Sequence, residues 1–175
     1  MQYGKLNFTE VENSPHLLAT PTKDATTANK LGEVLVSEID PSLADTAAFC
    51  EQYDIGLEVS ANCVIVKAKR GEKVTYAAIM ILATDQADVN NVIRRTLDAR
   101  KISFAPMDEA TSLTSMEFGG INPIGLPPDW PILVDTKVAN LDRAIIGSGL
   151  RKSKILTTGQ VIATLPNTQV LPLAK

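Results

Sequence analysis

Gly119-Gly120-Ile121-Asn122-Pro123-Ile124-Gly125 is the most informative stretch of this 175-residue sequence. Two adjacent glycines allow backbone angles that other residues avoid, and they let a ligand approach the main chain without an intervening side chain. Pro123 fixes its own φ and restrains Asn122 toward an extended conformation, and Gly125 then frees the backbone again. The stretch therefore predicts a rigid loop whose N–H groups are held in fixed directions, as a phosphate or oxyanion cradle requires.

A plainer interpretation of this loop is a tight connector between a helix and a strand, and spacing alone favours it. No Lys followed by Ser or Thr closes the loop, so it is not a Walker loop, and no dinucleotide-binding glycine pattern occurs elsewhere. Trp130 lies close behind Pro127 and Pro128 and could stack on a ligand, but a single tryptophan near prolines is more often a lid on the core.

Length and composition fit one domain with a substantial core. The net charge is -3 and no apolar run approaches the roughly 20 residues that a membrane-spanning helix needs. The N-terminus also lacks the basic start and apolar stretch of a secretory signal. We therefore expect a soluble, cytoplasmic protein without membrane contact, with residues 1–175 as a single domain and 1–32 as an N-terminal extension. The sequence pI near 5.2 argues against general coating of nucleic acid.

Cysteine and histidine are too scarce for several kinds of site. Cys50 and Cys63 match neither a disulfide framework nor a metal ribbon, and both are interpreted as small buried residues. His16 is the only histidine, so no Ser-His-Asp or Cys-His nucleophile system can be built around a well-placed imidazole. A conventional zinc site is equally disfavoured. We expect no metal and no cofactor.

The hydrophobic pattern predicts strands in runs, with helices inserted between them, which is typical of the α+β class. Val64–Val66 and Val74–Leu82 flank a turn and form a hairpin. Asp40 and Pro41 open a helix that ends near Gly56. The first thirty residues are expected to hold a strand or two and a polar connector. The remaining expected elements are strands at 35–39, 102–104, 131–135, 144–147 and 154–156 and helices at 85–101, 108–116 and 161–165.

The order of these pieces resembles a known family. A hairpin at 61–82, a helix at 85–101, the glycine loop, a strand at 131–135 and a glycine-bearing strand end at 145–149 are similar to the aminoacyl-tRNA editing domains of the YbaK/EbsC and prolyl-tRNA-synthetase-associated type. The likeness covers roughly residues 33–171. It implies a mixed, largely antiparallel curved sheet or open barrel with inserted helices.

The resemblance also implies an activity and a site. Members of that family hydrolyse the ester that links a wrong amino acid to the 3′ end of tRNA, acting in trans and without a metal or a covalent intermediate. The implied partners are the aminoacyl-tRNA 3′ end and an aminoacyl-tRNA synthetase or another protein. The residues carried over to catalysis are Gly120, Asn122 and Pro123. Those carried over to substrate binding are Asn62, Gly119, Ile121, Gly125 and Ser153.

Three positions depart from the family pattern. Asn62 stands where the family carries a lysine, and an amide supplies no charge. Asn122 replaces a hydroxyl residue of the loop, and Ser153 and Lys154 occupy the neighbourhood of a family acidic residue. Lys67 lies about 16 Å along the strand from Asn62, at roughly 3.3 Å per residue, and is not an obvious replacement. A basic group at Arg151, Lys152 and Lys154 could hold the tRNA end instead.

These departures leave two other interpretations open. The chain could keep the fold and pocket without catalysis and bind an aminoacyl or nucleotide-like ligand or a protein partner. It could also be a small interaction domain in which the glycine loop is only a connector, and then no cavity is expected beside Gly120.

Overall fold

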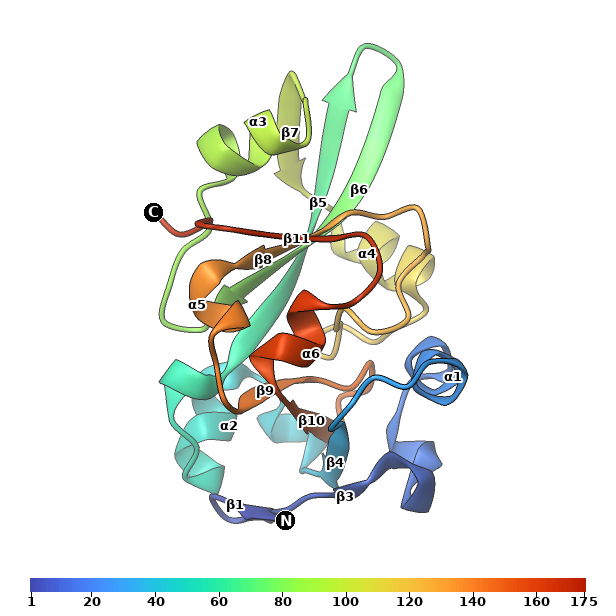
Figure 1. Cartoon of the computed structure of the whole chain (residues 1–175), viewed down its shortest axis with the longest axis vertical. Coiled ribbons are helices and arrows are strands. Elements are labelled where there is room, and N and C mark those ends of the chain that lie inside the picture. Colours follow the sequence, from blue (N-terminus) through green and yellow to red (C-terminus); the bar gives the residue numbers. More distant parts are fainter.

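Two sheets organise the chain, and the computed structural model describes all residues, 1–175 (Figure 1). The larger sheet has the order β11-β8-β6-β5-β7 and the smaller one β3-β4-β10-β9, and a short pair β1-β2 lies at the N-terminus. The strands are β1 Gln2–Tyr3, β2 Leu6–Asn7, β3 Thr9–Glu10, β4 Leu35–Glu38, β5 Ala61–Arg70, β6 Lys73–Leu82, β7 Lys101–Phe104, β8 Ile132–Asp135, β9 Ala144–Gly147, β10 Ser153–Thr157 and β11 Thr168–Leu171.

Most strand pairs are antiparallel, whereas β8 pairs in parallel with both β6 and β11. A single parallel bridge between Ser60 and Ile145 joins the two sheets without closing a barrel. The predicted α+β class, with a mixed and largely antiparallel open sheet, is therefore confirmed.

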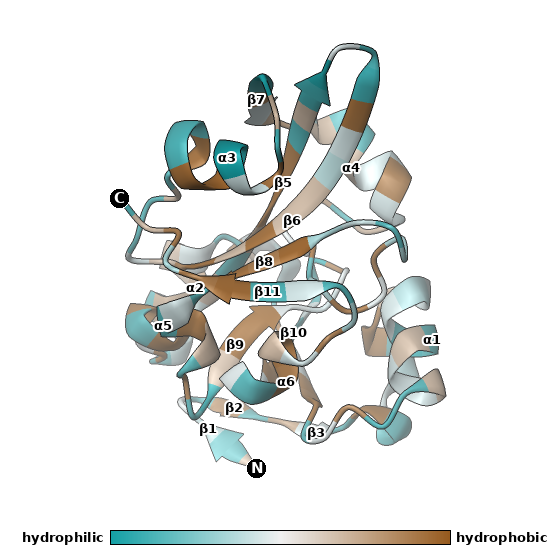
Figure 2. Ribbon diagram, turned by 45° about the horizontal axis from the view of Figure 1, so that its top comes forward, coloured by the Kyte–Doolittle hydropathy of each residue, from teal (hydrophilic) through white to brown (hydrophobic).

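The predicted hairpin is the longest feature of the larger sheet. β5 and β6 pair along their whole length, from Ala61 opposite Leu82 to Arg70 opposite Lys73, and Gly71 turns the chain with φ +60°. The inner part of β6, Ala77–Leu82, is buried, whereas both strands become exposed and polar toward the turn. The hairpin therefore projects beyond the rest of the molecule, and its outer end is hydrophilic (Figure 2).

Six short α-helices surround the sheets. α2 packs beside the smaller sheet, and α4 lies against the face of the larger sheet that also borders the smaller one. The helices are α1 Thr20–Ala28, α2 Thr46–Tyr53, α3 Arg94–Thr96, α4 Met107–Thr114, α5 Thr136–Ala139 and α6 Gly159–Ala163. No helix combines the length and the apolar character needed to cross a membrane.

Three expected elements differ from the structure. The helix expected to run from Pro41 to near Gly56 is split, because Asp40 caps only a 3₁₀ turn, Pro41–Leu43, and α2 starts afresh after Asp45. The helix expected at 85–101 is helical only over the π-helix Val89–Ile93 and α3, since Asp98 has φ +52° and ends it.

The expected polar connector at 20–24 is instead part of α1, which has Pro21 as its second residue and is rich in threonine. Threonine has low helix propensity, and so the helix gives a weak sequence signal. β11 was not expected either, because two of its four residues, Val170 and Leu171, are apolar and neither is buried.

Apolar side chains form three clusters. The largest lies between the two sheets and includes Ile65, Met80, Trp130, Val134 and Ile155. A second fills the other face of the larger sheet under the π-helix and α3, and a third lies between the smaller sheet and α2. Trp130 is buried and stacks on Tyr76 with ring centroids 5.4 Å apart, so its interpretation as a lid on the core agrees with its position.

Candidate functional site

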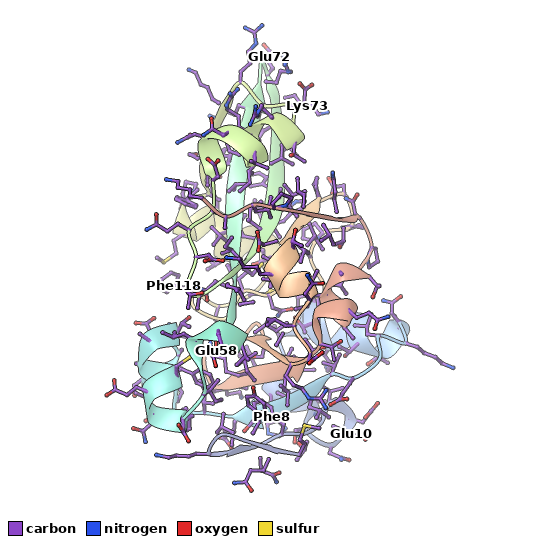
Figure 3. The ribbon with its side chains drawn as sticks, turned by 60° about the vertical axis from the view of Figure 1, so that its left-hand side comes forward. Phe8, Glu10, Glu58, Glu72, Lys73 and Phe118 are labelled. Carbon is purple, nitrogen blue, oxygen red and sulfur yellow. The ribbon has the colours of Figure 1, made fainter.

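A cavity of about 580 Å³ opens where the start of β5 meets the glycine loop, β9 and β10. Its deep walls are apolar and include Phe49 of α2, Ile65 of β5 and Ile145 of β9. The exposed lining side chains, which mark its rim, include Phe104 and Phe118. Figure 3 shows Phe118 at the edge of the molecule, between Glu58 and the hairpin tip. This volume lies within the range of small-molecule sites, about 300–1,000 Å³.

Lys154 is the one buried cation of this cavity. Lys154 is only 7 % exposed. Its Nζ donates a hydrogen bond to the Ala44 carbonyl at 3.1 Å and lies 5.2 Å from the centroid of the Phe49 ring. No carboxylate pairs with it. Burial lowers the pKa of Lys154 to about 8, because the charged form loses hydration. The cavity floor therefore carries a poorly hydrated ammonium group that can respond to a negative charge.

Asn62 lies in the same cavity, at its exposed side. Its Oδ1 accepts a hydrogen bond from Thr46 Oγ1 at 3.0 Å, which ties the start of β5 to α2. Asn62 and Lys154 come from strands of different sheets, yet both line the cavity. A cation is thus present in the cavity although position 62 does not supply it.

Two residues of the glycine loop that line the cavity have free amide groups. Gly119 and Ile121 both line it, and their N–H groups make no hydrogen bond within the chain. The Gly120 N–H, in contrast, donates to the Glu117 carbonyl at 3.0 Å, and a side chain at position 120 would press on the backbone of Leu150. Gly119 has φ +82°, which favours glycine there. The available donors of the loop are therefore those of Gly119 and Ile121.

Asn122 is fully buried and fastens the loop to α1. Its Oδ1 accepts from the Ile124 N–H at 2.7 Å, and its Nδ2 donates to Thr22 Oγ1 at 3.0 Å. Thr22 in turn donates to the Ile124 carbonyl. The N-terminal region, which the family resemblance does not cover, thus supports the loop from behind. These contacts explain why an amide, which both donates and accepts, occupies position 122.

The other loop and strand residues named from the sequence lie outside this cavity. Pro123 and Gly125 face a smaller cleft beside Trp130, and Gly125, at φ +93°, lets the loop pass against the Pro21 carbonyl. Ser153 is buried, where its hydroxyl bonds Ser148 and the Leu17 carbonyl. Of the eight residues predicted for the site, the structure brings Asn62, Gly119 and Ile121 to the cavity lining.

Lys67 is engaged elsewhere. Its Nζ pairs with Glu109 of α4 at 2.9 Å, and Tyr76 donates to the same carboxylate. The hydrogen bond from Tyr76, followed by that from Lys67, lowers the pKa of Glu109, and the bond to Glu109 raises the pKa of Lys67. The three side chains hold α4 against the sheet, and Lys67 is not a member of the cavity lining.

Sequence reasoning did not place Lys154 in a cavity, although it named it as a possible contact to the tRNA end. A signal was present: Lys154 is the one charged residue of the short strand segment Ser153–Thr157, all of which is buried. A lysine within such a strand is unusual unless its charge has a use or a partner. Cys63 was interpreted as small and buried, but it is only half-buried, because it lines the cavity; burial of its thiol raises the pKa to about 12.

No group of three or more His, Cys, Asp or Glu side chains is arranged to hold a metal ion.

The family model of the aminoacyl-tRNA editing domain matches residues 40–165, most of the chain. The chain belongs to this family. The editing domain is also 25 % identical over 117 residues to proline–tRNA ligase of Listeria innocua, an overlap of 66 % of this chain and 19 % of the ligase. The aligned part thus spans about a fifth of that relative.

Solved structures share the fold of the editing domain. A candidate trans-editing enzyme for prolyl tRNA synthetase superposes with a TM-score of 0.76 at 16 % identity. The superposition covers 90 % of this chain and 96 % of that enzyme's chain. A hypothetical protein of known crystal structure gives the same TM-score at 17 % identity, with 89 % and 99 % covered. At these identities, the likeness establishes a common fold.

Proposed function

We propose that this editing domain hydrolyses the ester bond between a wrongly attached amino acid and the 3′-terminal adenosine of tRNA, acting in trans and without a metal or covalent intermediate. The observation that carries the proposal is that Gly119 and Ile121, whose amides are free, and the buried Lys154 line one apolar cavity. The family match at residues 40–165 directs that chemistry to aminoacyl-tRNA.

The reaction that fits these groups is attack by water on the ester carbonyl. Negative charge develops on the carbonyl oxygen in the tetrahedral transition state, and N–H donors and a cation that are already in place stabilise it. The attacking water loses a proton, the bond from the carbonyl carbon to the ribose oxygen breaks, and that oxygen takes up a proton as it leaves. The neighbouring hydroxyl of the terminal adenosine can relay this proton, and the products are the free amino acid and the tRNA 3′ end. Because the cavity is mostly apolar, the charge of Lys154 acts with little screening by water.

The catalytic arrangement assigns different tasks to the predicted site residues. Gly119 and Ile121 supply donors, Asn62 contacts the ribose or the amino group, and Lys154 supplies the positive charge. Asn122 is a positioning residue, since it holds the loop against α1 through Thr22. Gly120, Pro123, Gly125 and Ser153 shape the backbone around the cavity, with no direct contact to the ester.

The proposal also covers the setting of the reaction. Residues 1–175 act as a single editing-type domain, because α1 of the N-terminal extension supports the loop. Apolar walls favour an amino acid with an apolar side chain. The likeness to proline–tRNA ligase points to a tRNA handled by that class of synthetase, and the place of action is the cytoplasm.

A panel of mischarged tRNAs tests this function, with a variant that fills the cavity. Wild-type protein should release the amino acid from at least one mischarged tRNA well above the buffer rate. Ala105→Trp, at the half-buried cavity wall, should abolish the release, whereas Ala47→Trp on the exposed side of α2 should leave it intact. Circular dichroism verifies folding of both variants. Buffer-level rates with every tRNA, or full activity of folded Ala105→Trp, contradict the proposal.

A further inference from the structure

The projecting part of the molecule carries an excess of positive charge. Residues 66–105 hold eight of the 17 Lys and Arg residues and four of the 20 Asp and Glu residues, a net charge of +4, while the rest of the chain has -7. We call the outer ends of β5, β6 and β7 with α3 the basic arm. Its cations are Lys67, Lys69, Arg70, Lys73, Arg94, Arg95, Arg100 and Lys101. An acidic protein therefore concentrates its cations on one projection.

Strand register in the arm sets like charges against each other. Lys101 of β7 lies directly opposite Lys69 of β5, and Lys73 of β6 lies directly opposite Arg70. Like charges in such cross-strand pairs destabilise a sheet. Lys69, Lys73 and Lys101 are exposed and form no ion pair, whereas Arg70 pairs with Asp98 at 3.0 Å and Lys67, further in on β5, pairs with Glu109. The pair Lys69–Lys101 therefore has no compensating ion pair within the chain, whereas an anionic ligand would supply one.

The arm is continuous with the cavity. β5 lines the cavity from Ala61 to Ile65 and reaches the arm at Lys69, about 23 Å beyond Asn62 at roughly 3.3 Å per residue. Phe104 at the cavity rim is three residues from Lys101 on the same edge strand, about 10 Å away by the same spacing. Figure 3 shows Lys73 and Glu72 at the far tip. A ligand that enters the cavity can therefore extend along the arm.

We infer that the basic arm binds the phosphate backbone of the tRNA strand that leads to the 3′ end. The inference rests on the proposed function for the end of the strand that enters the cavity. One strand of a duplex carries a phosphate about every 3.4 Å along the axis, so a path of 23 Å spans several of them. Lys69 and Lys101 lie side by side on one face of the sheet, and Lys73 lies at the tip on the other face. These exposed point charges can contact a backbone without reading a base sequence.

Neutralising the arm tests the inference. The variant Lys69→Gln, Lys73→Gln and Lys101→Gln removes three charges and the like-charge pairs, so the fold should be kept. Its matched control is Lys5→Gln, Lys30→Gln and Lys175→Gln. This control removes the same number of positive charges from three exposed lysines outside the arm. Binding of uncharged tRNA is measured by fluorescence anisotropy as a function of salt, which does not depend on hydrolysis.

The arm variant should bind tRNA about 10- to 100-fold more weakly at about 0.1 M salt. Its plot of log affinity against log salt should be shallower by about 2, since each single-strand phosphate contact contributes about 0.7. The control should match wild type. Hydrolysis of a small substrate, 2′(3′)-O-aminoacyl adenosine, should be equal in all three proteins because it does not reach the arm.

Two results separate the inference from the proposed function. Arm-dependent tRNA binding without any hydrolysis would overturn the function and keep the inference. The inference would be overturned, and the function kept, if the folded arm variant bound tRNA as tightly as wild type and hydrolysed mischarged tRNA as fast. Arm-dependent binding of polyglutamate but not of tRNA would assign the arm to an acidic protein surface and also overturn it.

Discussion

The cavity and the basic arm lie at opposite ends of the strand β5, and lysine has a different environment in each. In the cavity, Lys154 is buried against Phe49, and its pKa falls to about 8. On the arm, Lys69 and Lys101 are exposed, and they gain their effect from number rather than from burial. A single desolvated charge acts strongly over a few ångströms, whereas solvated charges act weakly and are screened by salt.

The difference suggests a division of tasks. The cavity provides local chemistry on the ester, and the arm provides affinity for a long polyanion. Changes to the cavity should affect the reaction of small and large substrates alike, and changes to the arm should affect only the large ones.

The largest expected effect concerns the cost of burying Lys154. Its folded-state pKa is about 8, below the ordinary 10.5, so the unfolded chain binds the extra proton between these values. The contribution of Lys154 to the free energy of unfolding therefore increases between about pH 8 and about pH 10.5. The increase is about 3 kcal/mol, because one pKa unit corresponds to about 1.36 kcal/mol. We expect Lys154→Met to be more stable than wild type at pH 7, with the advantage shrinking across that window.

Urea unfolding at several pH values measures this difference. Both proteins contain Cys63, whose raised pKa lowers stability above about pH 9, and its contribution cancels when the two are compared. Lys152→Met, which changes an exposed neighbour, is the control and should show no such trend. A stability difference that does not vary with pH would mean that Lys154 is as well hydrated as the arm lysines.

A smaller effect is expected at the support of the loop. Asn122→Ala leaves the buried Ile124 N–H without its acceptor and removes the donor to Thr22 Oγ1, which should lower the free energy of unfolding by about 2 kcal/mol. Activity on aminoacyl adenosine should fall as well, because the amides of Gly119 and Ile121 lose their fixed direction. Asn140→Ala, at an exposed site, serves as the control. Unchanged stability would remove α1 from the description of the site.

The rim should behave as an intermediate between cavity and arm. Phe118 lines the cavity and is 51 % exposed, so it can stack on a base of the tRNA end. A stacked base contributes about 1–3 kcal/mol, and Phe118→Ala should therefore raise KM for mischarged tRNA about 5- to 10-fold while leaving kcat unchanged. Leu113→Ala, on α4 and outside the cavity, is the control. A fall in kcat alone would instead assign Phe118 to the chemical step.

The smallest effect is expected when the family lysine is restored. Asn62→Lys would add a second cation to the cavity that already holds Lys154, and like charges disfavour each other's charged form. Hydrolysis of aminoacyl adenosine should stay within a few-fold of wild type or fall. A tenfold gain would show that Lys154 does not take the place of that lysine.

Local pattern predicted much of the fold. The hairpin and the strands at 132–135, 144–147 and 153–157 follow from apolar runs bounded by turns. Asp40 is an N-cap as expected, but of a 3₁₀ turn and not of the expected helix. Weak or broken helices were the failures. α1 is rich in threonine, and the region 85–101 ends its helix at Asp98, whose positive φ has no clear sequence signal.

The site was less predictable because it joins distant parts of the chain. The glycine loop could be found from its own residues, but which of its amides remain free depends on Glu117 and on the packing against Leu150. The roles of Thr22 and Lys154 depend on contacts across 100 and 110 residues, with Asn122 and Ala44. Spacing along the sequence carries no information about such contacts.

The central claim is that the buried Lys154 ammonium and the free loop amides form the hydrolytic site. Its most direct test is the single-turnover hydrolysis of aminoacyl adenosine by wild type, Lys154→Met and Lys152→Met at pH 7. We predict rapid hydrolysis by wild type and Lys152→Met and a loss of about 100-fold or more in folded Lys154→Met, the size of losing one well-placed stabilising group. Equal rates in wild type and Lys154→Met would contradict the claim.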